Sequence, residues 1–140
     1  MDHIVNNFCD YYRELTLDGL PKLSSLYDSH ALLEDPIHKI QGLSDIERYF
    51  KNMLTNLQYC RFDIDDVMQT ECQAFITWVM KFRHPKLNKS NEIKVSGISH
   101  IKFNELITYH RDYYDLGSMV YEHIPLLKYV LNNIKQRMRV

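Results

Sequence analysis

The apolar positions in the first third of the chain follow the spacing of helices. From Ile4 to Leu17, apolar side chains recur every three or four residues, which predicts a helix with one buried face. Asp18-Gly19 interrupts this pattern, and a second, short helix is predicted over Pro21–Tyr27. Residues 31–34 then predict a short strand, which Asp35-Pro36 should end.

A third helix and a run of strands make up the middle of the chain. Ser44 and Glu47 have the spacing of a capping box, and an apolar stripe follows them to Leu54. From about residue 59 to 115, the pattern changes to strands separated by polar turns, with a central strand over 74–82 that is apolar on both faces. The last two strands are predicted over Ile93–Phe103 and Ile107–Tyr114, so the sheet is expected to be a long antiparallel meander.

Beyond Gly117 the pattern becomes helical again, which predicts a terminal helix over about residues 118–138. The segment from Ser118 carries four basic residues and one acidic residue, Glu122. Such a helix packs on its own domain, closes a pocket mouth, meets a partner subunit, or lies on an anionic membrane surface. The membrane alternative is the least expected, because Trp and Phe anchors are absent. The apolar stripe consists of Ile124, Leu127, Val130, Leu131, Ile134 and Met138.

This order of helices followed by strands predicts an α+β fold. A chain of 140 residues suits a single domain, here with a core over about residues 1–116 and the terminal helix added to it. The 45% hydrophobic and 25% charged residues are typical of a globular protein. The formal net charge of -1 provides no field that would gather nucleic acid, so we expect no nucleic-acid partner.

The cysteines and the N-terminus bear on the compartment. Cys9, Cys60 and Cys72 lack the spacing of metal or redox motifs, which favours free thiols in a reducing environment. The first residues lack the basic start and apolar run of a signal peptide. No apolar run approaches the roughly 18 residues that a spanning helix needs. We therefore expect a cytoplasmic protein.

Several short motifs occur in a fixed order over about the first 115 residues. They are the segments 8–15, Leu26-Tyr27, 34–36 with Gly42 following, Tyr49-Phe50, Trp78, 97–103 and 110–115. Their order and spacing resemble the SnoaL-like and ketosteroid-isomerase-like branch of the nuclear transport factor 2-like superfamily. The resemblance implies a cone, with three N-terminal helices packed in a strongly curved, mainly antiparallel sheet around a small apolar pocket. It also implies a homodimer, whereas the terminal helix extends beyond the family pattern.

Strand alternation sorts the candidate site residues, because successive side chains point to opposite faces. On the last strand, His110, Asp112 and Tyr114 share one face, which by the resemblance faces the pocket. On the preceding strand, Ser99 and Ile101 are expected to point inward. The expected apolar wall of the pocket is formed by Tyr49, Phe50, Trp78, Ile101 and Tyr114.

Asp35 matches the position of the general base in the steroid isomerases. A carboxylate in an apolar pocket is desolvated, which makes it a better proton acceptor near neutral pH. The alternative is that Asp35 serves the Asp-Pro turn and caps the end of the strand.

Tyr12 lies near the position of the isomerases' oxyanion-stabilising phenol, allowing for a gap of one residue. A phenol aimed at a carbonyl oxygen would stabilise developing enolate charge. The alternative is a helix residue that packs against the sheet. The second oxyanion donor of the isomerases, a protonated Asp, falls on Ser99, whose hydroxyl is a weaker donor. This departure argues against steroid isomerase activity itself.

His110 and Asp112 form the more distinctive pair. An imidazole and a carboxylate two residues apart on one strand face can share a proton or orient a water molecule. The alternative is a structural pair that is hydrogen-bonded to Tyr or backbone groups. If Asp35 and Asp112 face one small cavity, their like charges would separate their proton affinities and give an acid and a base.

Metal and cofactor sites are not expected. The other histidines show no helical pair and no cysteine partner at zinc spacing. Four glycines form no phosphate-binding loop, and no nucleophile elbow is present.

Two functions from different classes follow from these observations. The first is a domain that binds a small apolar ligand, with cofactor-free acid–base chemistry of the isomerase, hydratase or cyclase type on a carbonyl, epoxide or polyketide-like compound. In that case Asp35 would be the base, His110 with Asp112 a proton shuttle, and Tyr12 and Ser99 polar anchors. The second is a non-catalytic dimeric module that binds a protein or membrane through its outer sheet face and terminal helix. The family includes both kinds of protein, so the fold does not decide the reaction.

Overall fold

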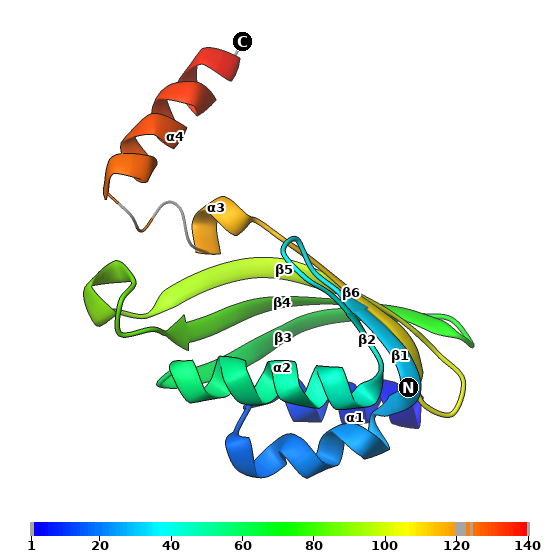
Figure 1. Cartoon of the computed structure of the whole chain (residues 1–140). Helices are drawn as coiled ribbons and strands as arrows, with labels where there is room; N and C mark the ends of the chain where they lie inside the picture. The colour runs from blue at the N-terminus through cyan, green and yellow to red at the C-terminus, as the bar shows by residue number, and fades with distance from the viewer. Residues whose placement is uncertain (1, 120–122, 124, 140) are drawn as a thin grey trace.

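The computed structural model describes residues 2–119, 123 and 125–139. Its helices are α1 (His3–Arg13), the 3-10 helix η1 (Leu17–Ser25), α2 (Leu43–Asn56), the 3-10 turn η2 (Asn88–Ser90), α3 (Leu116–Met119) and α4 (Pro125–Met138). Its strands are β1 (Tyr27–Glu34), β2 (Lys39–Gln41), β3 (Tyr59–Gln69), β4 (Gln73–Arg83), β5 (Ile93–Phe103) and β6 (Ile107–Tyr114). Three helical elements, α1, η1 and α2, cover one face of a curved sheet (Figure 1), which confirms the predicted α+β cone.

The six strands form one sheet in the order β2-β1-β6-β5-β4-β3. The four long strands β3 to β6 pair with their neighbours in antiparallel fashion, as the predicted meander requires. The first strand, β1, pairs with β6 in parallel, with Leu33 opposite His110. This pairing adds β1 to the meander beside its last strand, β6, and so brings the N-terminal part of the chain next to the C-terminal end of the sheet.

Alternation along the central strands follows the prediction. Trp78 on β4 and both Ser99 and Ile101 on β5 are buried on the helix-covered face. Phe75 on β4 and Ile98 on β5 occupy the alternate positions and are exposed on the outer face. The inner face of the sheet and the apolar sides of α1 and α2 thus form one core.

The start of α2 differs from the prediction. The helix begins at Leu43 with Gly42 as its N-cap, and no side chain caps it, so the capping box of Ser44 and Glu47 is wrong. The backbone of Gly42 has a φ of 93°, a conformation that glycine adopts readily. Its N–H also donates to the carbonyl of Ala31 on β1, at 2.8 Å. Gly42 therefore joins β2 to α2 where a side-chain cap was expected.

The first strand is longer than predicted. Tyr27 was expected to end the second helix, but that helix is a 3-10 helix ending at Ser25, and Tyr27 begins β1. The short strand β2, which pairs with residues 32–34 of β1, was not predicted. The consequence for the site is that Tyr27 lies in the sheet with its side chain fully buried.

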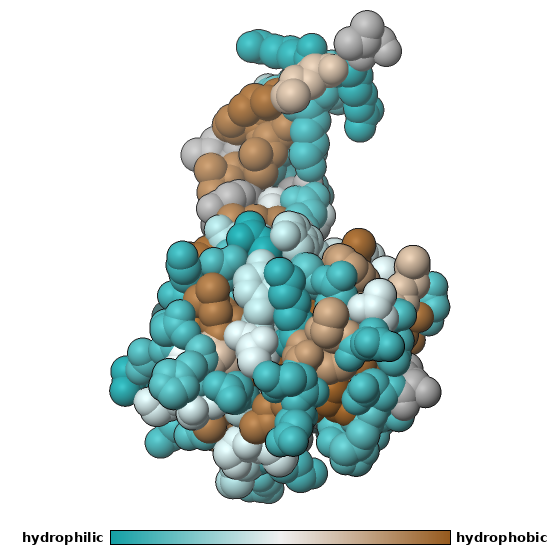
Figure 2. All heavy atoms as spheres, turned by 90° about the vertical axis from the view of Figure 1, so that its right-hand side faces the viewer, coloured by the Kyte–Doolittle hydropathy of each residue, from teal (hydrophilic) through white to brown (hydrophobic). Residues whose placement is uncertain are grey.

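Within its described residues, the C-terminal segment forms the helices α3 and α4 where one helix is predicted. α3 begins at Leu116, and the predicted place of Ile124 in the apolar stripe lies outside the described residues. α4 projects from the body of the molecule (Figure 1), and Figure 2 shows its apolar side chains gathered along one side. Within the described part of α4, Leu131 of the stripe is half-buried, and the other side chains of the stripe are 40% to 75% exposed: Leu127, Val130, Ile134 and Met138. Among the described helices, none is long and apolar enough to cross a membrane.

Candidate functional site

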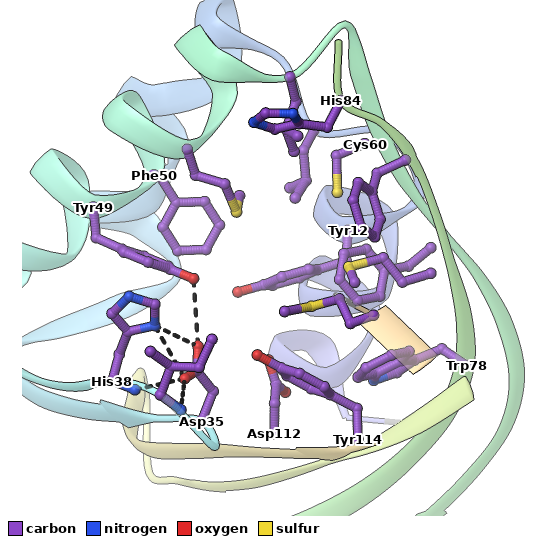
Figure 3. Close-up of a pocket in the computed structure, with 18 of the residues that line it drawn as sticks. Tyr12, Asp35, His38, Tyr49, Phe50, Cys60, Trp78, His84, Asp112 and Tyr114 are labelled. Atoms are coloured by element: carbon purple, nitrogen blue, oxygen red, sulfur yellow. Dashed lines mark hydrogen bonds and ion pairs between the residues drawn. The ribbon is translucent and has the colours of Figure 1, made fainter. Parts of the chain in front are cut away.

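A cavity of about 230 Å³ lies between the sheet and the helices α1 and α2 (Figure 3). Seven aromatic side chains line it: Tyr12, Tyr49, Phe50, Phe62, Trp78, Phe82 and Tyr114. Aliphatic and sulfur-containing side chains complete it: Leu15, Leu33, Ile37, Met53, Leu57, Cys60, Met80, Leu87 and Met119. The polar lining side chains are Asp35, His38, His84 and Asp112. The cavity is therefore apolar with a few polar groups, as is typical of small-molecule sites.

A chain of hydrogen bonds runs behind the cavity wall from α1 to β6. The hydroxyls of Tyr12 and Tyr27 are 2.7 Å apart, and the Tyr27 hydroxyl lies 2.6 Å from Nδ1 of His110. On the other side of the ring, Nε2 of His110 lies 2.6 Å from Oδ1 of Asp112. Since Tyr12 and Asp112 both line the cavity, the chain begins and ends at it.

The order of donors along this chain depends on the protons of His110. When the ring carries its proton on Nε2, this group donates to Asp112, while Nδ1 accepts from Tyr27, and Tyr27 accepts from Tyr12. When Nδ1 is protonated as well, Nδ1 donates to Tyr27, Tyr27 donates to Tyr12, and the Tyr12 hydroxyl can donate into the cavity. A change of proton at His110 is therefore transmitted to the cavity wall at Tyr12.

A second set of hydrogen bonds fixes the carboxylate of Asp112 from the side of the sheet. The Ser99 hydroxyl donates to Oδ1 of Asp112 at 2.5 Å, and the Trp78 indole N–H donates to the Ser99 oxygen at 2.9 Å. The indole can lie across β5 because Gly97 has no side chain there; a Cβ on Gly97 would lie 2.3 Å from the ring. Oδ1 of Asp112 thus has two partners, whereas its Oδ2 makes no hydrogen bond within the described part of the chain.

Asp35 occupies the turn between β1 and β2. Its Oδ1 accepts from the backbone N–H groups of Ile37 (2.8 Å) and His38 (2.7 Å), an arrangement that fixes the turn. The His38 ring lies 3.1 Å from both carboxylate oxygens, and the Tyr49 hydroxyl donates to Oδ2 at 3.4 Å. The carboxylate is nevertheless directed at the cavity, and its side chain is only 6% exposed. Oδ1 therefore serves the turn, as the structural alternative expects, while Oδ2 accepts from Tyr49 at the cavity wall.

Burial and the two carboxylates keep the phenols of the site protonated. Burial raises the pKa of Tyr49, and the nearby charges of Asp35 and Asp112 raise it further. The same causes in the same order raise the pKa of Tyr114. Burial is also the main reason that the pKa of Tyr12 lies well above its usual range. The phenols are therefore neutral hydrogen-bond donors at physiological pH, and both carboxylates act on the same part of the cavity.

Comparison with known proteins assigns the family. Residues 8–110 match the family model of the SnoaL-like domain. The chain belongs to the SnoaL-like domain family. No curated protein matches the sequence of this SnoaL-like domain.

Solved structures share the fold of this SnoaL-like domain. A proposed SnoaL-like polyketide cyclase from Shewanella putrefaciens has a TM-score of 0.75 and 16% identity, over 90% of this chain and 98% of the other. A protein from Catenulispora acidiphila with a ketosteroid isomerase-like fold, solved with trimethylamine, has a TM-score of 0.73 and 17% identity, over 88% and 92% of the two chains. A protein of unknown function from Burkholderia pseudomallei, described as nuclear transport factor 2-like, has a TM-score of 0.73 and 11% identity, over 85% and 95%. At these identities the likeness concerns the fold alone.

The structure of this SnoaL-like domain brings most of the predicted site residues together. The side chains that line the cavity are Tyr12, Asp35, Tyr49, Phe50, Trp78, Asp112 and Tyr114. Two predicted residues, Ser99 and His110, lie directly behind the wall and reach the cavity through Asp112. Ile101 is fully buried opposite His110 in the strand register and is not among the lining side chains.

Among the polar residues of the site, Tyr27, His38 and His84 are not singled out by the sequence pattern. Tyr27 was placed on a helix, so its link to His110, which is 83 residues away in the chain, was not foreseen. His38 was considered only as a metal ligand, although its position three residues after Asp35 is typical of a turn that folds back on an Asp side chain. Among the described residues, no group of three or more His, Cys, Asp or Glu side chains is placed to hold a metal ion.

Proposed function

We propose that this chain binds a small apolar molecule in the cavity and acts on it as a cofactor-free acid–base enzyme of the isomerase, hydratase or cyclase type. The observation that supports this most directly is the geometry of Asp112. One carboxylate oxygen is fixed by His110 and Ser99, while the other faces an apolar cavity without a partner in the described chain. A desolvated, firmly oriented carboxylate with a free oxygen is suited to remove or return a proton.

The proposed step begins with transfer of a proton from an acidic C–H of the ligand to Oδ2 of Asp112. The electron pair of that bond moves towards the ligand's carbonyl oxygen, and a hydroxyl on the wall donates a hydrogen bond to it. Tyr114 is suited to this role, because its hydroxyl makes no hydrogen bond within the described residues and its pKa is raised, first of all by burial. Return of the proton from Asp112 to another atom of the ligand completes an isomerisation.

The remaining polar groups have supporting roles in this proposal. His110 and Tyr27 hold Asp112 in place, and Tyr12 stands at the far end of this hydrogen-bond chain, at the cavity wall. Ser99 donates to Asp112 and is therefore directed at the carboxylate, which argues further against the oxyanion pair of the steroid isomerases. Asp35 is bound by its turn and by His38, so we assign the proton transfer to Asp112 and treat Asp35 as a charged binding group.

Proton exchange in heavy water tests this function without knowledge of the natural substrate. A panel of small cyclic ketones is incubated in D₂O with the protein, and the loss of α-proton signals is followed by NMR. We expect faster exchange than in buffer for at least one ketone. Replacing the base with Asp112→Asn should reduce this enhancement about 100-fold or more, the usual size of a general-base contribution.

The matched control is Asp66→Asn, which removes the same charge from an exposed position on β3. It should exchange at the wild-type rate. Equal rates for wild type and Asp112→Asn would contradict the proposed role of Asp112, and the absence of exchange for every ketone would contradict the enzyme function.

A dimeric interaction module is the second candidate, and the outer face of the sheet favours it. Phe75, Ile98 and Tyr113 are 42%, 41% and 51% exposed, and they lie on the neighbouring strands β4, β5 and β6. Thr77, His100 and Tyr109 share this face, with the ring of His100 stacked on Phe75 at 4.2 Å. An apolar patch of this kind is typical of a protein contact.

Sedimentation of the wild type against Ile98→Glu tests a homodimer through this face. The control is Val130→Glu on α4, which places the same charge on the other exposed apolar surface. Dissociation by Ile98→Glu alone would support the sheet-face dimer, whereas a monomeric wild type at micromolar concentration would contradict it.

A further inference from the structure

The charges on the cavity wall have one sign. Within the described part of the chain, the lining side chains include two carboxylates, Asp35 and Asp112, and no lysine or arginine. The side chains on this wall that have an ionisable nitrogen are the histidines His38 and His84. A bound carboxylate or phosphate would therefore find two negative charges and no permanent positive one.

The cationic side chains near this end of the sheet are paired outside the cavity. Arg111 on β6 lies 2.9 Å from Glu34, and Lys39 on β2 lies 3.7 Å from the same carboxylate. By strand alternation, Arg111 points to the face opposite that of Asp112, its neighbour in sequence. These cations therefore bring no permanent positive charge into the cavity, where the imidazoles of His38 and His110 contact the two carboxylates.

Aromatic rings line the same cavity as these two carboxylates. Seven of the twenty lining residues are Phe, Tyr or Trp. The face of such a ring carries negative electrostatic potential and attracts organic cations, most strongly where water is excluded. The Tyr49 hydroxyl touches Asp35, and Figure 3 shows Tyr49 and Tyr114 directed into the space that Asp35 and Asp112 face.

The behaviour of the phenols agrees with this arrangement. After burial, the charges of Asp35 and Asp112 are the main causes that raise the pKa of Tyr114. A negative field that disfavours a phenolate on the wall also disfavours an anionic ligand and favours a cationic one.

We infer that the cavity is selective for an organic cation, a compact apolar molecule that carries an amine or a quaternary ammonium group. The nitrogen lies among the aromatic rings beside Asp35, and the apolar part extends along the wall towards Trp78. This inference rests on the proposed function in so far as the ligand is the substrate of the same cavity. It then restricts that substrate to a carbonyl compound bearing a cationic nitrogen.

Three probes of nearly the same shape separate charge from apolar contact. They are choline, its neutral carbon analogue 3,3-dimethylbutan-1-ol, and the anion 3,3-dimethylbutanoate. Binding is followed through the NMR signal of the indole N–H of Trp78, which lines the cavity and is the single tryptophan of the chain. We expect choline to bind at least about tenfold more tightly than the alcohol, and the anion to bind weakest of all.

Charge removal inside and outside the cavity supplies the matched variants. Asp112→Asn and Asp35→Asn should each reduce the preference for choline over the alcohol about tenfold. Binding of the alcohol should change little, and in Asp66→Asn, on the exposed part of β3, the preference should remain as in wild type. The comparison of the three probes on wild-type protein needs no variant, so it stands even if one substitution prevents folding.

Three results would overturn the inference. They are equal or tighter binding of the alcohol, tightest binding of the anion, and no shift of the Trp78 signal with choline at tens of millimolar. These outcomes are separate from the proton-exchange test. Choline binding without any ketone exchange would refute the enzyme function alone, whereas exchange without a preference for cations would refute this inference alone.

Discussion

Replacing Tyr27 by Phe tests the hydrogen-bond chain behind the cavity. The Tyr27 hydroxyl is the shared partner of the Tyr12 hydroxyl, at 2.7 Å, and of Nδ1 of His110, at 2.6 Å. Tyr12 is 4% exposed and His110 is 0% exposed, so both groups lose a partner in a place that bulk water does not reach. Each buried polar group without a partner costs about 1–3 kcal/mol, so the loss of two partners by Tyr27→Phe should lower the free energy of unfolding by about 2–6 kcal/mol.

Urea denaturation at neutral pH measures this loss, with Trp78 fluorescence as the signal. The control is Tyr113→Phe, the same change on a side chain that is 51% exposed, which should alter the free energy of unfolding by less than about 0.5 kcal/mol. The double variant Tyr12→Phe with Tyr27→Phe should lose less than the sum of the two single variants, because a Phe at position 12 has no hydroxyl to leave unpaired.

A loss below about 0.5 kcal/mol for Tyr27→Phe, the range of ordinary surface substitutions, would refute this reasoning. It would mean that the two contacts contribute no net stability. A strictly additive double variant would refute the coupling between Tyr12 and Tyr27, even if each single variant were destabilised.

Three further predictions concern other parts of the molecule. Gly97→Ala should cost about 1–3 kcal/mol and shift the emission of Trp78, because the new Cβ would lie 2.3 Å from the indole; unchanged emission in a stable protein would contradict this. In native protein at pH 8, a thiol reagent should modify the exposed Cys72 but not the buried thiols of Cys9 and Cys60. Burial raises the pKa of Cys60 to about 12 and also raises that of Cys9, so neither forms the reactive thiolate. Fast modification of two or more thiols without denaturant would contradict this prediction. Stability should be independent of the buried phenols of Tyr12, Tyr27, Tyr49 and Tyr114 below pH 10 and should fall as pH rises above 10, because folding raises their pKa values and the unfolded chain releases these protons first. Tyrosinate absorbance that corresponds to all ten tyrosines of the chain before unfolding would contradict this.

Much of the fold could be predicted because the strands obey a simple rule. Alternation along residues 74–82 and 93–103 was sufficient to place Trp78 and Ser99 on the inner face, where the structure has them. The helix start at Gly42 could not be predicted, because it depends on a φ of 93° and on a hydrogen bond to Ala31 in β1. A local capping pattern contains no information about either.

Most residues of the site could be predicted from the sequence, but most of the hydrogen bonds between them could not. The pairing of His110 with Asp112 follows from their separation by two residues on one strand. The contact with Tyr27 depends on the parallel pairing of β1 with β6, for which the local sequence provides no signal. The double role of Asp35 was also beyond the sequence, since it depends on which oxygen of one carboxylate faces the turn.

The parallel pairing of β1 with β6 determines when the candidate site can form during folding. Tyr27 and His110 are 83 residues apart in the chain, so the chain must be nearly complete before they can meet. Contacts between distant segments carry a large loop-closure entropy and form slowly. During synthesis, the neighbouring strands β3 to β6 can pair with each other as they emerge from the ribosome. The strand β1 emerges earlier but cannot pair with β6 until β6 has been made. We therefore expect Asp112 to acquire its fixed orientation among the last events of folding, so that a nascent or truncated chain that ends before β6 has no site.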